Sequence, residues 1–519
     1  MENTRIIEGG KRGVFQVIFG RTMIIVVLLL AQFFFLFQWM FRMASYAPYL
    51  SGGVTIITGV MMLWILNTRD NPMIKLTWCI VIAALPIFGA LLYLFVRFDI
   101  GHRWEQKVIQ ATIDESRVHL PDQTRMLEQI RREDKELHNL AVYLRRYSGS
   151  CIWPNTQVEY FPSGEAKWKA MLEQLEQAKG FIFLEYFIVG QGRMWSSVLE
   201  ILARKAREGV DVRLMYDGTC AVTLLPYDYP KQMEKLGIKC KMFSPIRPLV
   251  STYYNNRDHR KILVIDGHTA FTGGINIADE YINVKRLHGH WKDTAIMLKG
   301  EAVRDFTMMF LQMWNAEERV HDYTPYWINA VPADIEQEGY VIPYGDSPLD
   351  DENVGEMVYM DMLNQAKDYV YIMTPYLILD NEMSQTLRFA AKRGVEVRLL
   401  LPHIPDKKYA FVLAKSHYKE LLEAGVHIYE YTPGFVHAKV VVSDDTKAVV
   451  GTINLDYRSL YLHFECAAYL YKVPAIKDIL KDFADTLERC QEITMEMVKK
   501  EKKLTVLAGK LMKLVAPLM

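Results

Sequence analysis

The chain has 519 residues, enough for roughly two or three domains, and half of its residues are hydrophobic, which excludes an intrinsically disordered protein. Its 61 basic residues balance its 61 acidic residues, so no global field attracts nucleic acid, and an anionic partner must be bound by a local cluster. The cysteines form no CxxC pair, which favours a reduced compartment over a disulfide framework or zinc site, and we expect no structural metal; they are Cys79, Cys151, Cys220, Cys240, Cys466 and Cys490.

Three stretches near the N-terminus contain no charged residue, and each has about the ~20 residues that cross a bilayer core as a helix. They are residues 22–41, 47–66 and 76–96. Trp and Tyr residues along these stretches favour membrane segments over buried core helices. We therefore predict that residues 1–100 form the membrane region of a multi-pass protein of the cell membrane.

The orientation of this region is predicted from its basic residues and its third segment. Basic residues such as Arg5 and Lys11 favour a cytoplasmic N-terminus. Pro86 and Gly89 interrupt the third segment, which predicts a re-entrant or interfacial hairpin rather than a full crossing. The catalytic part of the chain is then expected in the cytoplasm.

Residues 101–150 are rich in charge and prone to helix, and we predict a helical connector there. From about residue 151 onwards, strands alternate with helices. The first elements of this pattern are a strand at residues 180–189, a helix at 194–208 and a strand at 210–216.

The second half of the chain repeats the pattern of the first half. Residues 209–214 (GVDVRL) match residues 394–399 (GVEVRL). The repeat predicts two homologous α/β lobes, at residues 151–325 and 326–490. We place their junction in the irregular stretch at residues 321–338, where prolines and mixed charge interrupt the periodic pattern.

Each lobe contains one His-x-Lys motif, followed by an apolar β-branched run, an Asp, a Gly-containing turn and an Asn. The spacing is identical in both copies: His259, Lys261, Asp266 and Asn276 in the first lobe, and His437, Lys439, Asp444 and Asn454 in the second. On a strand, His and Lys two residues apart point to one face. Each Asp is an odd number of positions away, so it leaves that face and supports the motif from behind.

The duplication of this motif predicts a single site for a phosphodiester, because packing alone does not select His, Lys and Asn together. The two lysines neutralise charge on the phosphoryl oxygens of a five-coordinate transition state. The Asn276 and Asn454 amides and the turns at Gly274 and Thr452 are expected to donate hydrogen bonds there. The catalytic set is then His259, Lys261, Asp266, His437, Lys439 and Asp444, with neither a metal nor another cofactor.

The two histidines suit different roles in such a site. One can attack phosphorus, while the other protonates the leaving alkoxide and later deprotonates the incoming one. A neutral nucleophilic imidazole must be held in one tautomer, which requires a carboxylate behind each ring. Asp293 and Glu465, at similar distances downstream of the motifs, are the candidates.

The paired motifs resemble the HxKxxxxD signature of the phospholipase D superfamily, and the resemblance covers both lobes. Residues 374–376, 451–459 and 71–93 resemble bacterial cardiolipin synthases in particular. The resemblance implies mixed sheets flanked by helices and one pseudo-twofold catalytic unit. It also implies a reaction that joins two phosphatidylglycerols, giving cardiolipin and glycerol through a phosphatidyl-histidine intermediate, with the first-lobe His259 as nucleophile. The sequence departs from the family at His463, where Asn is expected.

The C-terminal residues 491–519 are predicted to form an amphipathic helix, because leucines such as Leu504, Leu507 and Leu511 recur at helical spacing with lysines elsewhere. This helix could lie on an anionic bilayer or pack on the catalytic lobes. Gly509 and Pro517 weaken it at two points.

Other functions use the same motifs. A phospholipase D or another phosphatidyltransferase would keep the site and use water, serine or ethanolamine as acceptor. A nuclease is disfavoured by the neutral net charge and the membrane segments. A lipid-binding scaffold with a dead site is disfavoured because both motifs are intact. The expected partners are therefore phosphatidylglycerol and an anionic lipid bilayer, without nucleic acid.

Overall fold

The computed structural model of the chain describes residue 34 and residues 47–98, 103–245, 256–321, 323–327 and 337–518. The predicted membrane segment at residues 22–41 lies outside these ranges except for residue 34, as does most of the predicted junction. The chain divides into two compact units. The first comprises residues 1–104, 246–254 and 518, and the second comprises the remainder.

Within its described residues, the first unit contains the helices α3 (Ala47–Leu66), α4 (Pro72–Ala84) and α5 (Pro86–Phe98). Their shared core includes Trp78 of α4 and Tyr93 of α5, whose ring centroids are 5.2 Å apart. None of the helices within the described ranges is both long and apolar enough to cross a membrane. The predicted crossings therefore stay a prediction.

The predicted interruption of the third apolar segment is confirmed. α4 ends before Leu85 and α5 begins at Pro86, because proline fits the first turn of a helix but breaks its interior. A side chain at Gly89 would collide with the backbone of Ile82, at 2.8 Å from its Cα. Gly89 therefore allows α5 to pack closely against α4.

The described residues of the second unit form two large sheets and a separate two-stranded sheet of β7 (His290–Lys292) and β13 (Gly434–Val436). The first has the order β1-β8-β6-β5-β2-β3-β4. Its strands are β1 (Thr156–Phe161), β2 (Phe181–Tyr186), β3 (Asp211–Asp217), β4 (Lys239–Phe243), β5 (Lys261–Ile265), β6 (Thr269–Gly273) and β8 (Ala295–Gly300). β2, β3 and β4 are parallel to one another and the other neighbouring pairs are antiparallel, so the sheet is mixed.

The second sheet repeats this order as β9-β16-β15-β14-β10-β11-β12, with β17 added at the end. Its strands are β9 (Tyr340–Asp346), β10 (Tyr369–Met373), β11 (Glu396–Pro402), β12 (His427–Tyr431), β14 (Val440–Ser443), β15 (Lys447–Gly451), β16 (Glu465–Tyr471) and β17 (Cys490–Glu492). The equal strand order confirms the prediction of two homologous α/β lobes.

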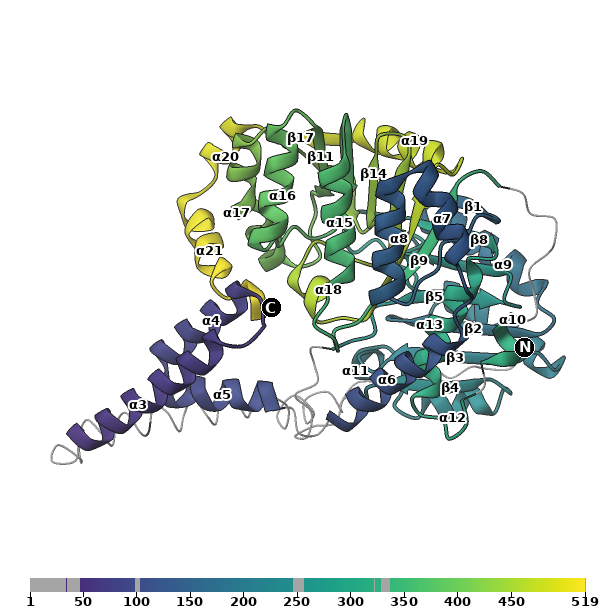
Figure 1. Cartoon of the computed structure of the whole chain (residues 1–519), viewed down its shortest axis with the longest axis horizontal. Coiled ribbons are helices and arrows are strands. Elements are labelled where there is room, and N and C mark those ends of the chain that lie inside the picture. Colours follow the sequence, from purple (N-terminus) through teal and green to yellow (C-terminus); the bar gives the residue numbers. More distant parts are fainter. Residues whose placement is uncertain are drawn as a thin grey trace. The chain divides into compact units, whose positions relative to one another are not determined.

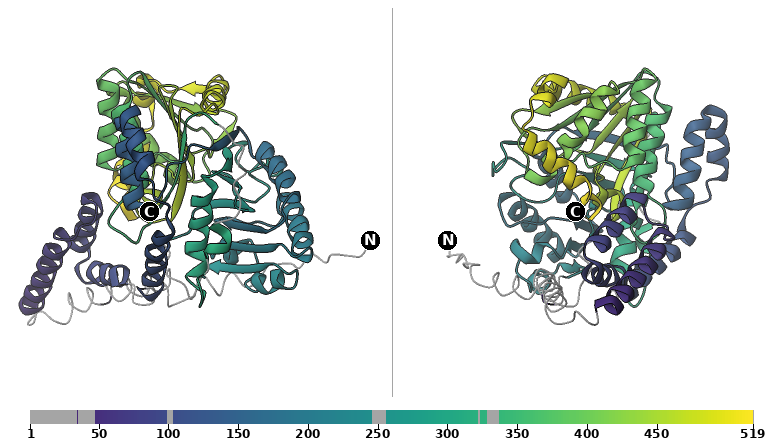
Figure 2. Two further views of the ribbon diagram at one scale, coloured as in Figure 1. Left: turned by 45° about the vertical axis from the view of Figure 1, so that its right-hand side comes forward. Right: turned by 90° about the vertical axis from the view of Figure 1, so that its left-hand side faces the viewer.

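Helices cover both faces of each sheet because the inner strands are apolar on both sides. In β2, Leu184 packs in the core with α10, whereas Phe183 stacks on Phe310 of α13 at 4.5 Å. Figures 1 and 2 show α15, α16 and α17 side by side along one face of the second sheet, with α19 on the other. The larger helices are α9 (Gly164–Glu176), α10 (Arg193–Arg207), α13 (Val303–Asn315), α15 (Val354–Gln365), α16 (Asn381–Lys392), α17 (Lys408–Glu423) and α19 (Ile476–Leu487); the short ones are α11 (Cys220–Thr223), α12 (Tyr229–Glu234), α14 (Thr324–Trp327) and α18 (Tyr457–Tyr461).

The connector is helical, as predicted. It comprises α6 (Arg103–Ser116), the 3-10 helix η1 (Arg117–His119), α7 (Thr124–Glu133) and α8 (Lys135–Tyr147). Although it precedes the first lobe in the chain, α8 packs on the second: Leu137, Leu140 and Leu144 belong to the core that contains α15 and β9. The end of α6 contacts the first lobe, where Gln312 of α13 donates to the Ser116 hydroxyl at 2.7 Å. This connection ties the two lobes together.

The prediction of one C-terminal helix over residues 491–519 is wrong in its extent. The segment begins within β17 and continues as α20 (Met495–Lys500), α21 (Lys503–Lys513) and η2 (Ala516–Leu518). α21 packs on α17 through Gly509, where a Cβ would lie 3.0 Å from that of Ser416. Leu504, Leu507 and Leu511 remain exposed. The helix thus packs on a lobe with one face and leaves its leucines uncovered.

Candidate active site

Both His-x-Lys motifs lie at the beginning of a strand in the centre of a sheet. Lys261 is the first residue of β5 and pairs with Tyr186, the last residue of the antiparallel strand β2. Lys439 directly precedes β14. The motifs therefore lie at the carboxyl ends of the parallel strands, the edge at which open α/β sheets bind ligands.

The two lobes are interlocked at the motifs by backbone hydrogen bonds. The backbone N–H of His259 donates to the carbonyl of Phe464 in the second lobe at 2.9 Å, and that of His437 donates to Lys292 in the first lobe at 2.7 Å. In addition, β7 (His290–Lys292) pairs in parallel with β13 (Gly434–Val436). Each motif is thus held by the other lobe.

The carboxylates predicted behind the imidazoles are also exchanged between the lobes. Nδ1 of His259 lies 2.8 Å from Oε1 of Glu465, and Nδ1 of His437 lies 2.7 Å from Oδ2 of Asp293. Both carboxylates are fully buried. The sequence predicted these residues but contained no signal for the exchange, which depends on how the sheets pack. Since Nδ1 is engaged in each ring, Nε2 is left for chemistry.

Burial keeps both imidazoles neutral in the absence of substrate. Burial, and then the charge of Lys261, hold the pKa of His259 well below its ordinary value. Burial and Lys439 lower the pKa of His437 to about 4. At Asp293, burial alone would raise the pKa, but His437, Lys439 and the backbone N–H of Thr294 together hold the pKa below its usual range. The His437 pair therefore retains an ionised carboxylate that can stabilise a protonated ring.

Each motif lysine lies beside the histidine of its own motif. Nζ of Lys261 donates to the carbonyl of His259 at 2.5 Å, and Nζ of Lys439 donates to that of His437. Both side chains are buried. Burial lowers the pKa of Lys261 to about 8 and that of Lys439 to about 7. Two ammonium groups in one buried site disfavour each other, so an anionic ligand between them would be stabilising.

Gly274 and Thr452 occupy equivalent positions but support their carboxylates differently. The Thr452 hydroxyl donates to Glu465. A Cβ at Gly274 would lie 2.1 Å from Oδ1 of Asp293, so no side chain fits there. Both backbone N–H groups donate to carbonyls of the neighbouring strand segment. The N–H groups of Gly274 and Thr452 themselves are therefore not free to donate to substrate, because the sheet already uses them, and donation from the rest of each turn stays a prediction.

The two asparagines have different surroundings. Oδ1 of Asn276 accepts from the backbone N–H of Ile188, and Nδ2 donates one of its two N–H groups to the Tyr281 hydroxyl at 2.8 Å. The predicted donation from Asn276 to substrate therefore stays a prediction that depends on its second N–H. Oδ1 of Asn454 is buried without a hydrogen-bond partner among the described residues.

Asp266 and Asp444 lie away from the imidazoles, at the far ends of their strands. Asp266 accepts hydrogen bonds from the backbone of Lys179, Gly180 and Phe181 at 2.7–2.8 Å. Asp444 accepts three equivalent bonds at the beginning of β10. Both adopt a positive φ of 51°. Asp266 and Asp444 were predicted both as members of the catalytic set and as supports behind the motif. Their position away from the imidazoles corrects the first prediction and agrees with the second.

A third histidine, which the sequence singled out only as a departure from its family, borders the site. The His463 ring centroid lies 5.5 Å from that of His259. Ligand atoms of His463, His259 and Glu465 lie within 4.8 Å of one another, a set that could hold a metal ion. Glu465 is already hydrogen-bonded to His259, so a metal ion would compete with the arrangement that orients the ring.

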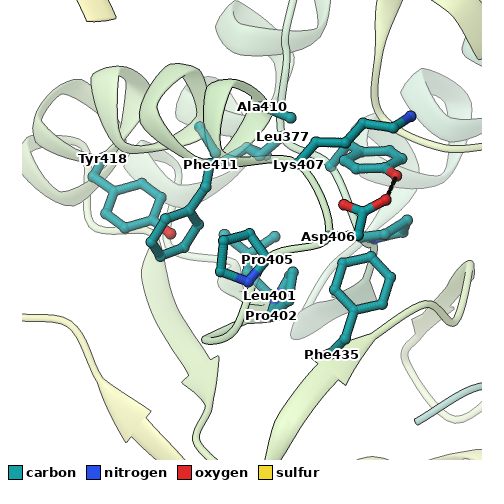
Figure 3. A pocket seen from close by; sticks show the side chains of 13 residues that line it. Leu377, Leu401, Pro402, Pro405, Asp406, Lys407, Ala410, Phe411, Tyr418 and Phe435 are labelled. Atoms are coloured by element: carbon teal, nitrogen blue, oxygen red, sulfur yellow. Dashed lines mark hydrogen bonds between the residues drawn. The ribbon is translucent and has the colours of Figure 1, made fainter. Parts of the chain in front are cut away.

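A small, mostly apolar hollow borders the His437 side of the site (Figure 3). One of its walls is Phe435, whose ring centroid lies 5.9 Å from that of His437. Tyr376 donates to Asp406 at 2.6 Å, drawn as the dashed line in Figure 3. Lys407 lies over the Tyr376 ring. The hollow is therefore lined by the apolar ring of Phe435, next to His437, and by the charged side chains of Asp406 and Lys407.

Comparison with known proteins matches both lobes and the N-terminal helices. A family model described as cardiolipin synthase, PLD-like domain, matches residues 171–314 and 359–487, and one described as phospholipase D-nuclease N-terminal matches residues 56–97. The chain is 52% identical over 457 residues to an uncharacterized protein of Streptococcus mutans, covering 88% of this chain and 99% of the relative.

Two further relatives carry a functional name. Cardiolipin synthase 2 of Bacillus anthracis is 34% identical over 437 residues, covering 83% of this chain and 84% of the relative. Cardiolipin synthase of Halalkalibacterium halodurans is 32% identical over 447 residues, covering 85% and 88%. The crystal structure of phosphatidylserine synthase from Haemophilus influenzae has a TM-score of 0.52 at 15% identity, covering 70% of this chain and 93% of that chain, which supports the fold alone.

Proposed function

The chain belongs to the cardiolipin synthase family of the phospholipase D superfamily, and we propose that it transfers the phosphatidyl group of one phosphatidylglycerol to a second, giving cardiolipin and glycerol. The observation that carries this proposal is the pair of imidazoles, each held at Nδ1 by a carboxylate of the other lobe, beside two buried ammonium groups.

In the first half-reaction, Nε2 of His259 attacks the phosphorus of the donor lipid. The bond from phosphorus to the glycerol oxygen breaks, and His437 gives its proton to that oxygen. The neutral state of His259 supports its role as nucleophile, and the ionised Asp293 supports His437 as the proton donor. Lys261 and Lys439 stabilise the phosphoryl oxygens.

In the second half-reaction, a hydroxyl of the second phosphatidylglycerol gives its proton to His437 while its oxygen attacks phosphorus. The phosphorus–nitrogen bond to His259 breaks, and the free ring is restored. Before each turnover His437 must be protonated, although burial lowers its pKa to about 4. The negative charge of a bound phosphodiester supports this protonation, because an anion beside the ring favours its charged form.

We further propose that the protein acts at the cell membrane, with catalytic lobes in the cytoplasm. In the first unit, Ile56, Val60 and Leu63 of α3 are each at least 60% exposed. In the second unit, α21 has exposed leucines and the exposed Lys503 and Lys510. The uncharged surface of α3 suits the apolar interior of a bilayer, and the leucines and lysines of α21 suit the surface of an anionic bilayer.

The proposal is tested with purified full-length protein in vesicles of phosphatidylglycerol. Mass analysis should show cardiolipin and glycerol in equal amounts, and His259→Ala should form neither. Serine, ethanolamine and water are then compared as acceptors at matched lipid concentration. Phosphatidic acid or another phosphatidyl ester as main product would contradict the proposed acceptor, while retaining the same site chemistry.

A further inference from the structure

His463 lies beside the proposed nucleophile, and both of its ring nitrogens are buried and unused. Its side chain is 10% exposed, and neither nitrogen has a hydrogen-bond partner among the described residues. Nδ1 lies 3.8 Å from Oε1 of Glu465, too far for a hydrogen bond. A neutral imidazole always carries one N–H, and a buried N–H without a partner is unfavourable. The structure thus contains a donor that lacks an acceptor in the site.

The pseudo-twofold relation between the lobes shows what is unusual about this position. Two residues before Asp293, Trp291 lies against the His437 ring, with ring centroids 5.2 Å apart. Two residues before Glu465, His463 lies against the His259 ring in the same way. Nε1 of Trp291 donates to Asp293 at 3.5 Å. An aromatic ring is therefore common to both sides, but only the His259 side has a ring whose nitrogens are unpartnered.

The surroundings of His463 are suited to an anion. Burial, and then the charges of Arg458 and Lys261, hold the pKa of His463 well below its ordinary value, so the ring is neutral in the absence of substrate. The same positive charges would attract a phosphate. An oxygen of that phosphate would accept the unpaired N–H, and its negative charge would offset the mutual repulsion of the cations.

We propose, building on the proposed function, that His463 is a substrate-binding residue that donates a hydrogen bond to a non-bridging oxygen of the phosphodiester attacked by His259. The backbone N–H groups of Gly274 and Thr452 and one N–H of the Asn276 amide already donate within the protein. His463 thus supplements the two lysines on the nucleophile side.

The test compares His463→Phe, which keeps an aromatic ring without a donor, with His463→Asn and His463→Gln, which restore a donor at two reaches. Each full-length variant is assayed with chelator present, for the rate of phosphatidyl-enzyme formation and for kcat/KM. Loss of one hydrogen bond to a charged phosphate should lower kcat/KM about 10- to 100-fold in His463→Phe. His463→Asn or His463→Gln should recover most of that loss. Trp291→Phe, the matched change beside His437, should have a smaller effect on phosphatidyl-enzyme formation.

A second measurement separates binding from packing. Phosphorothioate diastereomers of the donor lipid replace one non-bridging oxygen at a time with sulfur, a poorer acceptor. The wild type should discriminate between the two diastereomers more strongly than His463→Phe. An unchanged ratio, wild-type activity in His463→Phe, or equal impairment of all three His463 variants would overturn the proposal.

Two further outcomes are distinguishable. In one outcome, chelator inactivates the wild type and zinc restores its activity, whereas neither chelator nor zinc changes the activity of His463→Asn. The unpartnered nitrogens then belong to a metal site, and the proposal is wrong. If the wild type forms phosphatidyl-enzyme but no cardiolipin, the proposed acceptor fails, whereas the donor step still measures the role of His463.

Discussion

Oε1 of Glu465, in the second lobe, lies 2.8 Å from Nδ1 of His259, in the first lobe. The reverse exchange joins Asp293 of the first lobe to His437 of the second. Neither lobe therefore contains a complete imidazole–carboxylate pair of its own, and the site depends on the docking of both.

Replacing Glu465 with Gln should lower kcat about 10²- to 10⁴-fold, because an amide no longer fixes the tautomer that exposes the lone pair of Nε2. Steady-state kinetics and urea unfolding of the same preparation test this. Glu430→Gln removes a carboxylate from His403, a similar pair at 2.8 Å outside the site, and is the matched control. Equal losses in both variants would contradict the orienting role of Glu465.

The two histidines should differ in acid-quench trapping of radiolabelled phosphatidyl-enzyme. His259→Ala should give no adduct. His437→Ala should still form an adduct from a lipid with an activated aryl leaving group, because general acid help is worth about 10²- to 10⁴-fold and such a group does not need it. An adduct in His259→Ala and none in His437→Ala would reverse the assignment.

Because the protonated form of His437 becomes scarcer above its pKa of about 4, kcat/KM should fall with rising pH, and this fall should become steeper through about pH 7 to 8. Lys439, with a pKa of about 7, and Lys261, with a pKa of about 8, lose their charge in this range in the free enzyme. The profile of kcat should fall at higher pH, since bound phosphate raises both pKa values. Lys439→Arg keeps its charge and should move the kcat/KM limb upward, whatever its effect on the absolute rate. An unmoved limb would assign the titration to another group.

Gly274→Ala should reduce activity by at least about tenfold through Asp293, comparable to losing an orienting partner. The new Cβ would lie 2.1 Å from Oδ1 of Asp293 and 2.8 Å from the carbonyl of His437. Gly345→Ala is the matched control, since its Cβ would meet only ordinary contacts beginning at 3.6 Å. The activities of both variants are measured at a pH where both are folded. Full activity of Gly274→Ala would show that a Cβ at this position does not displace Asp293.

Asp266→Ala should destabilise the fold by about 1–3 kcal/mol, because three backbone N–H groups at the beginning of β2 lose their acceptor. The kcat of the folded fraction should change little, since Asp266 does not touch the imidazoles. Urea unfolding combined with active-site titration measures both quantities, and Asp444→Ala should behave alike. A large fall in kcat without loss of stability would instead make Asp266 a catalytic residue.

The sequence was sufficient to predict two homologous α/β lobes, because residues 209–214 and 394–399 repeat and the motif offsets are identical. It also predicted the strands β5 and β14, since an apolar β-branched run follows each motif lysine. The break between α4 and α5 followed from Pro86, whose ring excludes it from a helix interior. These features depend on local backbone chemistry, which neighbouring residues determine.

Other features depended on tertiary packing. Sequence spacing could not reveal that the backbone N–H groups of Gly274 and Thr452 are used inside the protein, because their acceptors belong to other strand segments. Nor could it show that α21 packs on α17 while its leucines stay exposed.

The sequence by itself determined which residue types the site contains: two imidazoles, two ammonium groups and two carboxylates. The tertiary structure alone decided which carboxylate orients which ring, and that His463 lies beside His259 with unused nitrogens. The physical reason is that residue type and spacing fix local direction along a strand, whereas the partner across an interface is fixed only when two sheets pack and bury their shared edge.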